Sequence, residues 1–263
     1  MPETSMRVEL VQMTDPKFAD IAAGCCTHRD IPDVHHTYNR LRGACFSGHF
    51  SILEHIVVTF EISGISRACS HQLVRHRVAS YAQSSQRCVD QDSFDYVMPE
   101  SMKGKTISLS NSEKEGATEI DADIEFRVTM AKLMATYNRM IAAGVPAEDA
   151  RYILPNACCT NIVVTMNLRE ASHFCALRRC SRTQWELREV ADRMAKQITD
   201  RLESYGVECL EKLFEPACAQ NGYCKEQHGC KRKVYYNALE DSFYKGYLRE
   251  ELRKSLERSE KTN

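Results

Sequence analysis

The chain has 263 residues, of which 43% are hydrophobic and 27% are charged, and its formal net charge is −1. This length and composition are typical of one large globular domain, or of one domain with an appendage, that buries a substantial core. The balanced charge disfavours a protein that binds nucleic acid through an overall basic surface, so any anion site must be local.

The N-terminal residues, MPETSMRVEL, contain no basic stretch followed by an apolar run, and a secretory signal needs both. No stretch approaches the ~20 apolar residues that span a bilayer. The 13 cysteines are therefore expected to be reduced thiols. We expect a cytoplasmic protein without a membrane partner.

In chain order, the first elements predicted are two helices, a strand and a short helix. Residues 15–26 predict a helix that Asp15 caps, and residues 36–47 predict a second. Residues 56–62 alternate between apolar and polar side chains, which indicates a half-buried strand. Residues 66–74 predict a short helix that leads into a cationic turn.

The middle of the chain predicts a loop, a helix and a strand. Residues 101–118 are polar and poorly periodic, which favours a loop. Apolar side chains recur at helical spacing over residues 126–141, and Gly144 ends that helix. Residues 161–166 predict a strand.

Three further helices are predicted in the remainder. Asn167 is a good N-cap for the first, and Ser181 with Gln184 forms a capping box for the second. Residues 235–257 predict the last. Helices outnumber strands, so the sequence predicts an α+β protein dominated by helices.

The first cationic cluster lies in LVRHRVASYAQSSQR, residues 73–87, where Arg75, His76 and Arg77 precede several hydroxyl and amide side chains. Such a loop can wrap a phosphate, because arginine presents a rigid fork of donors to oxygen anions. The structural alternative is that the basic triplet complements a helix dipole. The pattern matches neither a P-loop nor a Rossmann fingerprint.

The second cluster lies in NLREASHFCALRRC, residues 167–180. On a helix that begins at Leu168, Arg169 and His173 lie in one stripe, whereas Arg178, at ~100° per residue, points the opposite way. The helix thus presents two cationic faces, although charges that merely keep a helix soluble are an equally simple reading.

The third stretch is SGHFSILEH, residues 47–55, in which His49 and Ser51 lie before the predicted strand. A lone histidine in a loop is more often structural than functional.

Together these stretches resemble the flavin-dependent thymidylate synthases. The signature of that family is Arg-His-Arg, seven residues and then Ser, which matches Arg75–Arg77 and Ser85. GHFSILEH upstream, and ARYILP and NLREASHFCALR downstream, are similar to the other blocks of the family and come in the same order. The resemblance covers roughly residues 5–205.

The resemblance implies that the chain methylates dUMP to dTMP. Methylenetetrahydrofolate supplies the carbon, and bound FAD, reduced by NADPH, supplies the hydride. It also implies an α/β core with a mixed sheet and added long helices, and a homotetramer whose active sites are built from several subunits.

The resemblance also assigns the site residues. For dUMP they are Gln72, Arg75, Gln83, Ser84, Ser85, Gln86, Arg87, Arg151 and Arg178. For FAD they are His49, Ser51, Arg75, His76, Arg77, Gln83, Asn167, Arg169 and His173. Arg178 matches the arginine that acts on the pyrimidine ring, and a permanent cation there polarises uracil. Gln83 departs from the family pattern, in which Glu is common.

Near the C-terminus, Cys218, Cys224 and Cys230 recur with five residues between neighbours. Reduced structural thiols, a metal site and a redox disulfide are all compatible with this spacing, which is not a standard zinc pattern, and no metal is assigned from it. We expect a catalytic domain over residues 1–230, with a cysteine-rich segment at 216–232, and a helical extension over residues 231–263.

Two alternatives from other classes stay open. The arginine-rich loops also suit a non-catalytic nucleotide- or RNA-binding protein, and the C-terminal cysteines suit a metal-binding interaction module on a degenerate core. Bound flavin distinguishes the enzyme from the first alternative, and metal content tests the second.

Overall fold

The computed structural model describes residues 5–27, 34–87, 93–108, 119–208, 210–221, 224 and 230. The chain separates into two compact units, each made of two stretches of sequence. Unit 1 comprises Met1–Thr14 and Ile56–Asn167, and unit 2 comprises Asp15–His55 and Leu168–Asn263. The first cationic cluster of the sequence therefore belongs to unit 1, and most of the second belongs to unit 2.

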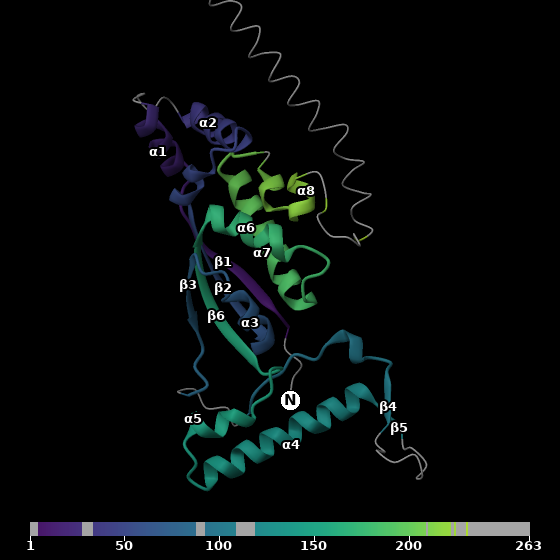
Figure 1. Ribbon diagram of the computed structural model, residues 1–263. Helices are drawn as coiled ribbons and strands as arrows, with labels where there is room; N and C mark the ends of the chain where they lie inside the picture. The colour runs from purple at the N-terminus through teal and green to yellow at the C-terminus, as the bar shows by residue number, and fades with distance from the viewer. Residues whose placement is uncertain are drawn as a thin grey trace, which may run out of the picture. The chain divides into compact units, whose positions relative to one another are not determined.

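A four-stranded sheet in the order β1-β2-β6-β3 lies at the centre of unit 1 (Figure 1). Its strands are β1 (Arg7–Met13), β2 (Val57–Ser66), β3 (Ala79–Gln83) and β6 (Cys159–Asn167). All three pairings are antiparallel. The α+β class is thus confirmed, whereas the expected mixed sheet is wrong. The reason is that β6 inserts between β2 and β3, so those two parallel strands are never neighbours.

The buried face of this sheet follows the period of two predicted for residues 56–62. Val58, Phe60 and Ile62 of β2 are fully buried, and the side chains between them are not. In register, Val58 lies opposite Met166 and Phe60 lies opposite Val164, both of which are buried on β6. These cross-strand apolar pairs fix the register of the two central strands.

Helix α3 (Arg67–Leu73) begins where β2 ends and packs against β2 and β6. The Ser66 hydroxyl caps it by accepting a hydrogen bond from the amide of Cys69, at 3.0 Å. The short helix predicted over residues 66–74 is confirmed, and it delivers the chain into the Arg75 turn.

A second core of unit 1 lies under the long helix α4 (Ala122–Ala142), where Phe94, Tyr96, Met98 and Met130 are buried together. The shorter elements of this part are η2 (Glu100–Met102), β4 (Thr106–Ser108), β5 (Glu119–Asp121), α5 (Ala147–Ala150) and η3 (Arg151–Ile153).

The helix predicted over residues 126–141 is confirmed, but the loop predicted over residues 101–118 is wrong in part. Thr106–Ser108 is a short strand, because it pairs with Glu119–Asp121, outside the polar stretch. Residues 109–118 lie outside the described residues.

Unit 2 is helical in its described part. Its elements are α1 (Lys17–Thr27), α2 (Val34–Phe46), η1 (Phe50–His55), α6 (Leu168–Arg178), α7 (Trp185–Ser204), η4 (Glu211–Phe214) and α8 (Ala217–Asn221). Helix α6 contacts η1, α7, η4 and α8, so it is the central element of this unit (Figure 1).

The start of α7 differs from the predicted capping box at Ser181. The helix begins at Trp185, and the side chain of Gln184 caps it by accepting a hydrogen bond from the amide of Leu187, at 2.9 Å. The Ser181 carbonyl instead accepts from Arg188, at 3.1 Å, so the residue lies in the turn before the helix.

No helix among the described residues is both long and apolar enough to cross a membrane. The helix predicted over residues 235–257 lies outside the described residues. The proposed domain boundary after residue 230 therefore stays a prediction.

Substitution of Gly64 by alanine should strongly reduce the free energy of unfolding. Its φ is +69°, and a Cβ built there lies 2.6 Å from the Ser5 carbonyl oxygen. The left-handed conformation costs a non-glycine residue ~1–2 kcal/mol, and the Ser5 backbone must also move. Gly48 has a φ of +80° with nothing within 4 Å of its Cβ, so Gly48→Ala is the matched control. Urea unfolding should show a clearly larger loss for Gly64→Ala. Equal losses would mean that the close approach to Ser5 contributes nothing.

Candidate functional site

The turn between α3 and β3 presents two arginines to solvent and buries the histidine between them. Arg75 and Arg77 are exposed, whereas His76 is only 5% exposed. From β3, the Tyr81 hydroxyl lies 3.0 Å from the Leu73 carbonyl oxygen and 2.8 Å from that of His76, and its single proton is shared between these two acceptors. Tyr81 therefore holds the turn in the conformation that directs both guanidinium groups outward.

A concavity of about 670 Å³ lies beside this turn and is lined by His71, Val74, Arg75 and Arg77. Its volume is in the range of small-molecule sites. Two permanent cations at its wall suit an anionic ligand, because arginine stays protonated and binds phosphate oxygens in pairs. This concavity is the candidate anion site of unit 1.

The serines predicted to bind the nucleotide follow directly after β3. The Ser84 amide donates to the Asn161 carbonyl at 2.9 Å, which extends the pairing of β3 with β6 by one residue. The Ser85 hydroxyl accepts from the Arg87 amide at 3.2 Å and so closes a local turn. Ser84, Ser85 and Arg87 are exposed on this turn.

Gln83 joins three elements of unit 1. Its side-chain nitrogen donates to the Ser70 hydroxyl of α3 at 2.8 Å and to the Thr160 hydroxyl of β6 at 3.1 Å. The Ser70 hydroxyl donates in turn to the Arg67 carbonyl, at 3.0 Å. A glutamate carboxylate has no proton to donate, so it would compete for the Ser70 proton. The amide at position 83 is thus matched to its local partners.

Arg67, which the sequence did not indicate as a site residue, lies close to two residues predicted to bind the nucleotide, Ser84 and Arg151. It donates weakly to the Ser84 carbonyl, at 3.4 Å. Burial lowers the pKa of Arg67; the Cys158 thiol opposes this, and the positive charge of Arg151 lowers the pKa further. Ser84 and Arg151, which are distant in sequence, therefore lie around one guanidinium group. A helix N-terminal arginine gives no distinctive signal in the sequence, which is why it was missed.

In unit 2, the residues predicted to bind the flavin lie on two packed elements. His49 and Ser51 are exposed at the start of η1, and Arg169 and His173 are exposed on α6, which packs against η1. The guanidinium group of Arg169 forms an ion pair with the Glu54 carboxylate of η1. The expected cationic stripe therefore exists, but Glu54 partly neutralises it. The sequence reasoning missed this partner because it lies far from Arg169 in the chain.

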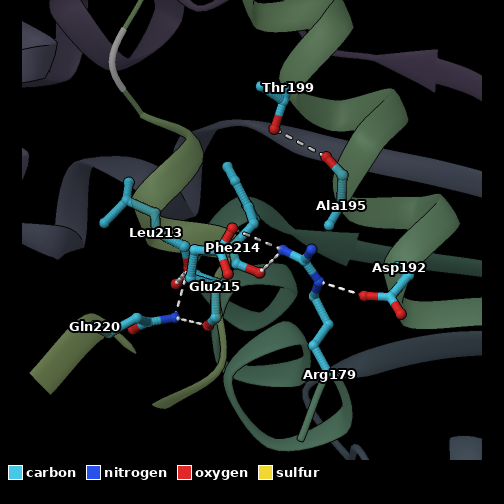
Figure 2. A network of polar contacts seen from close by, with 9 residues as sticks. Arg179, Asp192, Ala195, Thr199, Leu213, Phe214, Glu215 and Gln220 are labelled. Carbon is cyan, nitrogen blue, oxygen red and sulfur yellow. Dashed lines mark hydrogen bonds and ion pairs between the residues drawn. The ribbon is translucent and has the colours of Figure 1, made fainter. Parts of the chain in front are cut away.

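Arg178 and Arg179, adjacent at the end of α6, have different surroundings. Arg179 donates to the Asp192 carboxylate and to the Phe214 carbonyl, each at 2.7 Å, and lies 3.5 Å from the Glu215 carboxylate (Figure 2). Burial by itself lowers the pKa of Arg179, but the hydrogen bond to Asp192 and the charges of Glu215 and Asp192 outweigh it, so the pKa is raised. Arg178 is half-buried.

The cysteines nearest the motifs are poor nucleophiles where the structure describes them. Cys69 and Cys175 are fully buried, and burial raises the pKa of Cys175 to about 12, with the Arg179 charge opposing the shift. A reactive thiol needs a lowered pKa and some exposure. Cys180 is half-buried, and Cys88 lies outside the described residues.

Within unit 1 the structure brings together Arg75 and Arg77 at the concavity, and Ser84 and Arg151 around Arg67. Within unit 2 it places Ser51 on η1, with His49 just before it, and Arg169 and His173 on α6, which packs against η1. Gln72, Gln86 and Asn167 are half-buried in unit 1. The roles of these residues toward dUMP and FAD stay predictions.

The sequence matches a family described as "Thymidylate synthase complementing protein" over residues 9–202. The flavin-dependent thymidylate synthase of Pyrococcus furiosus is 45% identical over 195 residues, which cover 71% of this chain and 74% of the relative. That of Thermococcus onnurineus is 46% identical over 183 residues, which cover 68% and 69%. Residues 9–202 contain both cationic clusters and the stretch 47–55, whereas Cys218, Cys224 and Cys230 lie beyond them.

One solved structure with a similar fold is that of the UMP/dUMP methylase PolB from Streptomyces cacaoi bound with 5-Br dUMP. It is 22% identical, with a TM-score of 0.59, and the match covers 75% of this chain and 92% of that one. At this identity the likeness supports the fold alone.

Arg179→Ala should destabilise the protein by about 2–4 kcal/mol, because it leaves two partly buried carboxylates and one carbonyl without their donor. Arg178→Ala, one residue away, is the matched control and should cost less, since it keeps the bonds of Arg179 to Asp192 and Phe214. Denaturant unfolding of both variants measures the difference. A larger loss for Arg178→Ala would reverse the roles assigned here.

Buried thiols should resist alkylation in the folded protein. Burial raises the pKa of Cys45 and Cys175 to about 12, so iodoacetamide should modify the exposed Cys25 and leave those two unmodified, as read by peptide mass spectrometry. Between about pH 9 and 12 the unfolded chain ionises these thiols while the folded chain keeps them protonated. Stability should therefore fall as the pH rises through this range. Rapid labelling of Cys175 at neutral pH would contradict the assignment.

Proposed function

Since the chain belongs to the flavin-dependent thymidylate synthase family, we propose that it catalyses the reductive methylation of dUMP to dTMP. The proposed carbon donor is methylenetetrahydrofolate, the cofactor is FAD and the reductant is NADPH. The observation that supports this proposal best is the concavity at Arg75 and Arg77, which places permanent cations where the family signature lies in an otherwise neutral chain.

The residues fit the charges of both ligands. dUMP carries a phosphate and FAD a pyrophosphate, and arginine pairs with such groups bidentately. We assign dUMP to Gln72, Arg75 and the turn after β3, with Gln83 and Arg151. We assign FAD to two sets of residues, one in each unit. The set in unit 1 is Arg75, His76, Arg77, Gln83 and Asn167, and the set in unit 2 is His49, Ser51, Arg169 and His173.

The charge on Arg178 has a chemical role in this proposal. When bound, the flavin supplies the hydride that completes the new methyl group. Arg178 donates to the uracil oxygen and stabilises the negative charge that develops on the ring, since a positioned cation favours the anionic form. The half-buried setting of Arg178 strengthens that effect relative to bulk water. No cysteine attacks the ring, because the described thiols nearest the motifs are buried or lack a partner base in the sequence.

We also propose a homotetramer in the cytoplasm. The residues assigned to each ligand are widely separated along the chain and belong to both units, which suits sites completed by neighbouring subunits. Light scattering of the flavin-loaded protein tests this proposal, and a stable monomer with full activity would contradict it.

Purified protein should be yellow and should form dTMP from dUMP with methylenetetrahydrofolate and NADPH. A protein that cannot be loaded with FAD but still binds nucleotides would favour a non-catalytic nucleotide-binding protein. Absorbance spectroscopy and product analysis decide between these outcomes.

Arg178→Ala should lower the rate of dTMP formation by at least about 100-fold, because one transition-state donor is removed, while the protein stays yellow. Arg193→Ala is the matched control, since Arg193 pairs with Glu189 on an exposed face of α7. Cys69→Ala and Cys175→Ala should each keep turnover. A folded, yellow cysteine variant that loses turnover, together with nucleotide trapped on that cysteine in the wild type, would overturn the mechanism.

A further inference from the structure

Four cysteines of unit 2 come from the end of α6 and from the region around α8. They are Cys180, Cys218, Cys224 and Cys230, all half-buried, and none is in a disulfide. The last three are evenly spaced in sequence. Cys180 lies 38 residues before Cys218, so only the folding of the chain can bring it near them.

A polar network holds the two elements that carry Cys180 and Cys218. Arg179, next to Cys180, donates to the Phe214 carbonyl at 2.7 Å. Gln220, two residues after Cys218, donates to the carbonyls of Leu213 and Glu215 at 2.8 and 2.7 Å (Figure 2).

Ser172 of α6 also donates to the Leu213 carbonyl, at 2.6 Å, and α6 packs directly against α8. Both elements are therefore fixed to the same three-residue segment, Leu213–Glu215. The cysteines beside these anchors are consequently held near one another.

The electrostatics agree with this arrangement. Burial raises the pKa of the Cys218 thiol, and Cys224, Cys180 and Cys230 raise it further. Charges that influence one another in this way lie close together, since the interaction weakens with distance. The other three thiols therefore lie close enough to Cys218 to influence it, rather than being scattered over the unit.

We propose that Cys180, Cys218, Cys224 and Cys230 form a four-thiolate metal centre. Four cysteine ligands select soft metals, namely Zn²⁺ in tetrahedral geometry or iron in an iron–sulfur cluster. Among the described residues, no three of these sulfurs lie within 4.8 Å of one another. Metal binding therefore requires the four sulfur atoms to move closer together. Binding Zn²⁺ converts the thiols to thiolates and releases their protons to solvent, without any oxidant.

The centre has a structural role. It links the chain after α8 to the end of α6, two residues from Arg178. The proposal does not depend on flavin or nucleotide chemistry, because its ligands lie outside the residues assigned to dUMP and FAD.

Metal analysis of the full-length protein, purified anaerobically under reducing conditions, tests the proposal. We expect about one zinc ion or one cluster's equivalent of iron and sulfide per chain; zinc and iron contents distinguish the two occupants. X-ray absorption of a zinc form should show only sulfur neighbours, at about 2.3 Å. Apoprotein made with a chelator should rebind Zn²⁺ or reconstitute a cluster.

Single Cys→Ser variants at the four positions should each lose metal affinity at least tenfold, whereas Cys25→Ser, at an exposed cysteine, should keep it. Cys224→His retains a metal ligand and should retain zinc if zinc is the occupant. Should a variant fail to fold, the wild-type metal content and rebinding still decide the matter. Wild-type protein that binds neither zinc nor iron, or that holds these cysteines in disulfides under reducing conditions, would overturn the proposal.

Discussion

The charge of Arg179 is the constraint on which unit 2 depends. A guanidinium group that is about four-fifths removed from solvent must be paired, because an unpaired buried charge costs several kcal/mol. Its partners come from α7 and from the end of η4, so pairing it fixes the end of α6 against both. The residues next to Arg179 in sequence are therefore also held in place. Arg178 on one side and Cys180 on the other are placed by a residue that takes no part in the proposed chemistry.

In unit 1, the uncharged side chains of Tyr81 and Gln83 hold the cationic turn in place. Two exposed arginines repel each other, so the backbone of the turn that carries Arg75 and Arg77 must be held in place. The Tyr81 hydroxyl holds it by hydrogen bonding to two backbone carbonyl groups. Gln83, on the same strand as Tyr81, is bonded to α3 and β6. Because these supports carry no charge, they hold the turn without neutralising Arg75 and Arg77. A chain with a net charge of −1 can thereby present a local cationic site.

The sequence predicted those features that local patterns determine, and it failed where distant segments compete. The alternation over residues 56–62 and the helical spacing over residues 126–141 are local patterns, and both predictions are confirmed. The antiparallel sheet was not predictable, because it depends on β6 inserting between β2 and β3, which end at Ser66 and Gln83, far before β6 begins at Cys159. Ser181 satisfied the capping-box pattern, yet Gln184 caps α7. Likewise the pairing of Arg169 with Glu54 and the proximity of Arg151 to Arg67 have no signature in the linear sequence.

The abundance of cysteine can be reconciled with a reaction that uses none of them as a nucleophile. Burial raises the pKa of Cys45, Cys158 and Cys175 to about 12. These thiols therefore stay protonated and act as small apolar side chains. Cys180, Cys218, Cys224 and Cys230 are less buried, and a soft metal is the partner that turns such thiols into stable thiolates. The buried thiols of the first group therefore lack the lowered pKa that a cysteine nucleophile requires. In the proposed mechanism, the charge that polarises the substrate comes instead from a group that needs no deprotonation, and Arg178 at the end of α6 meets that condition.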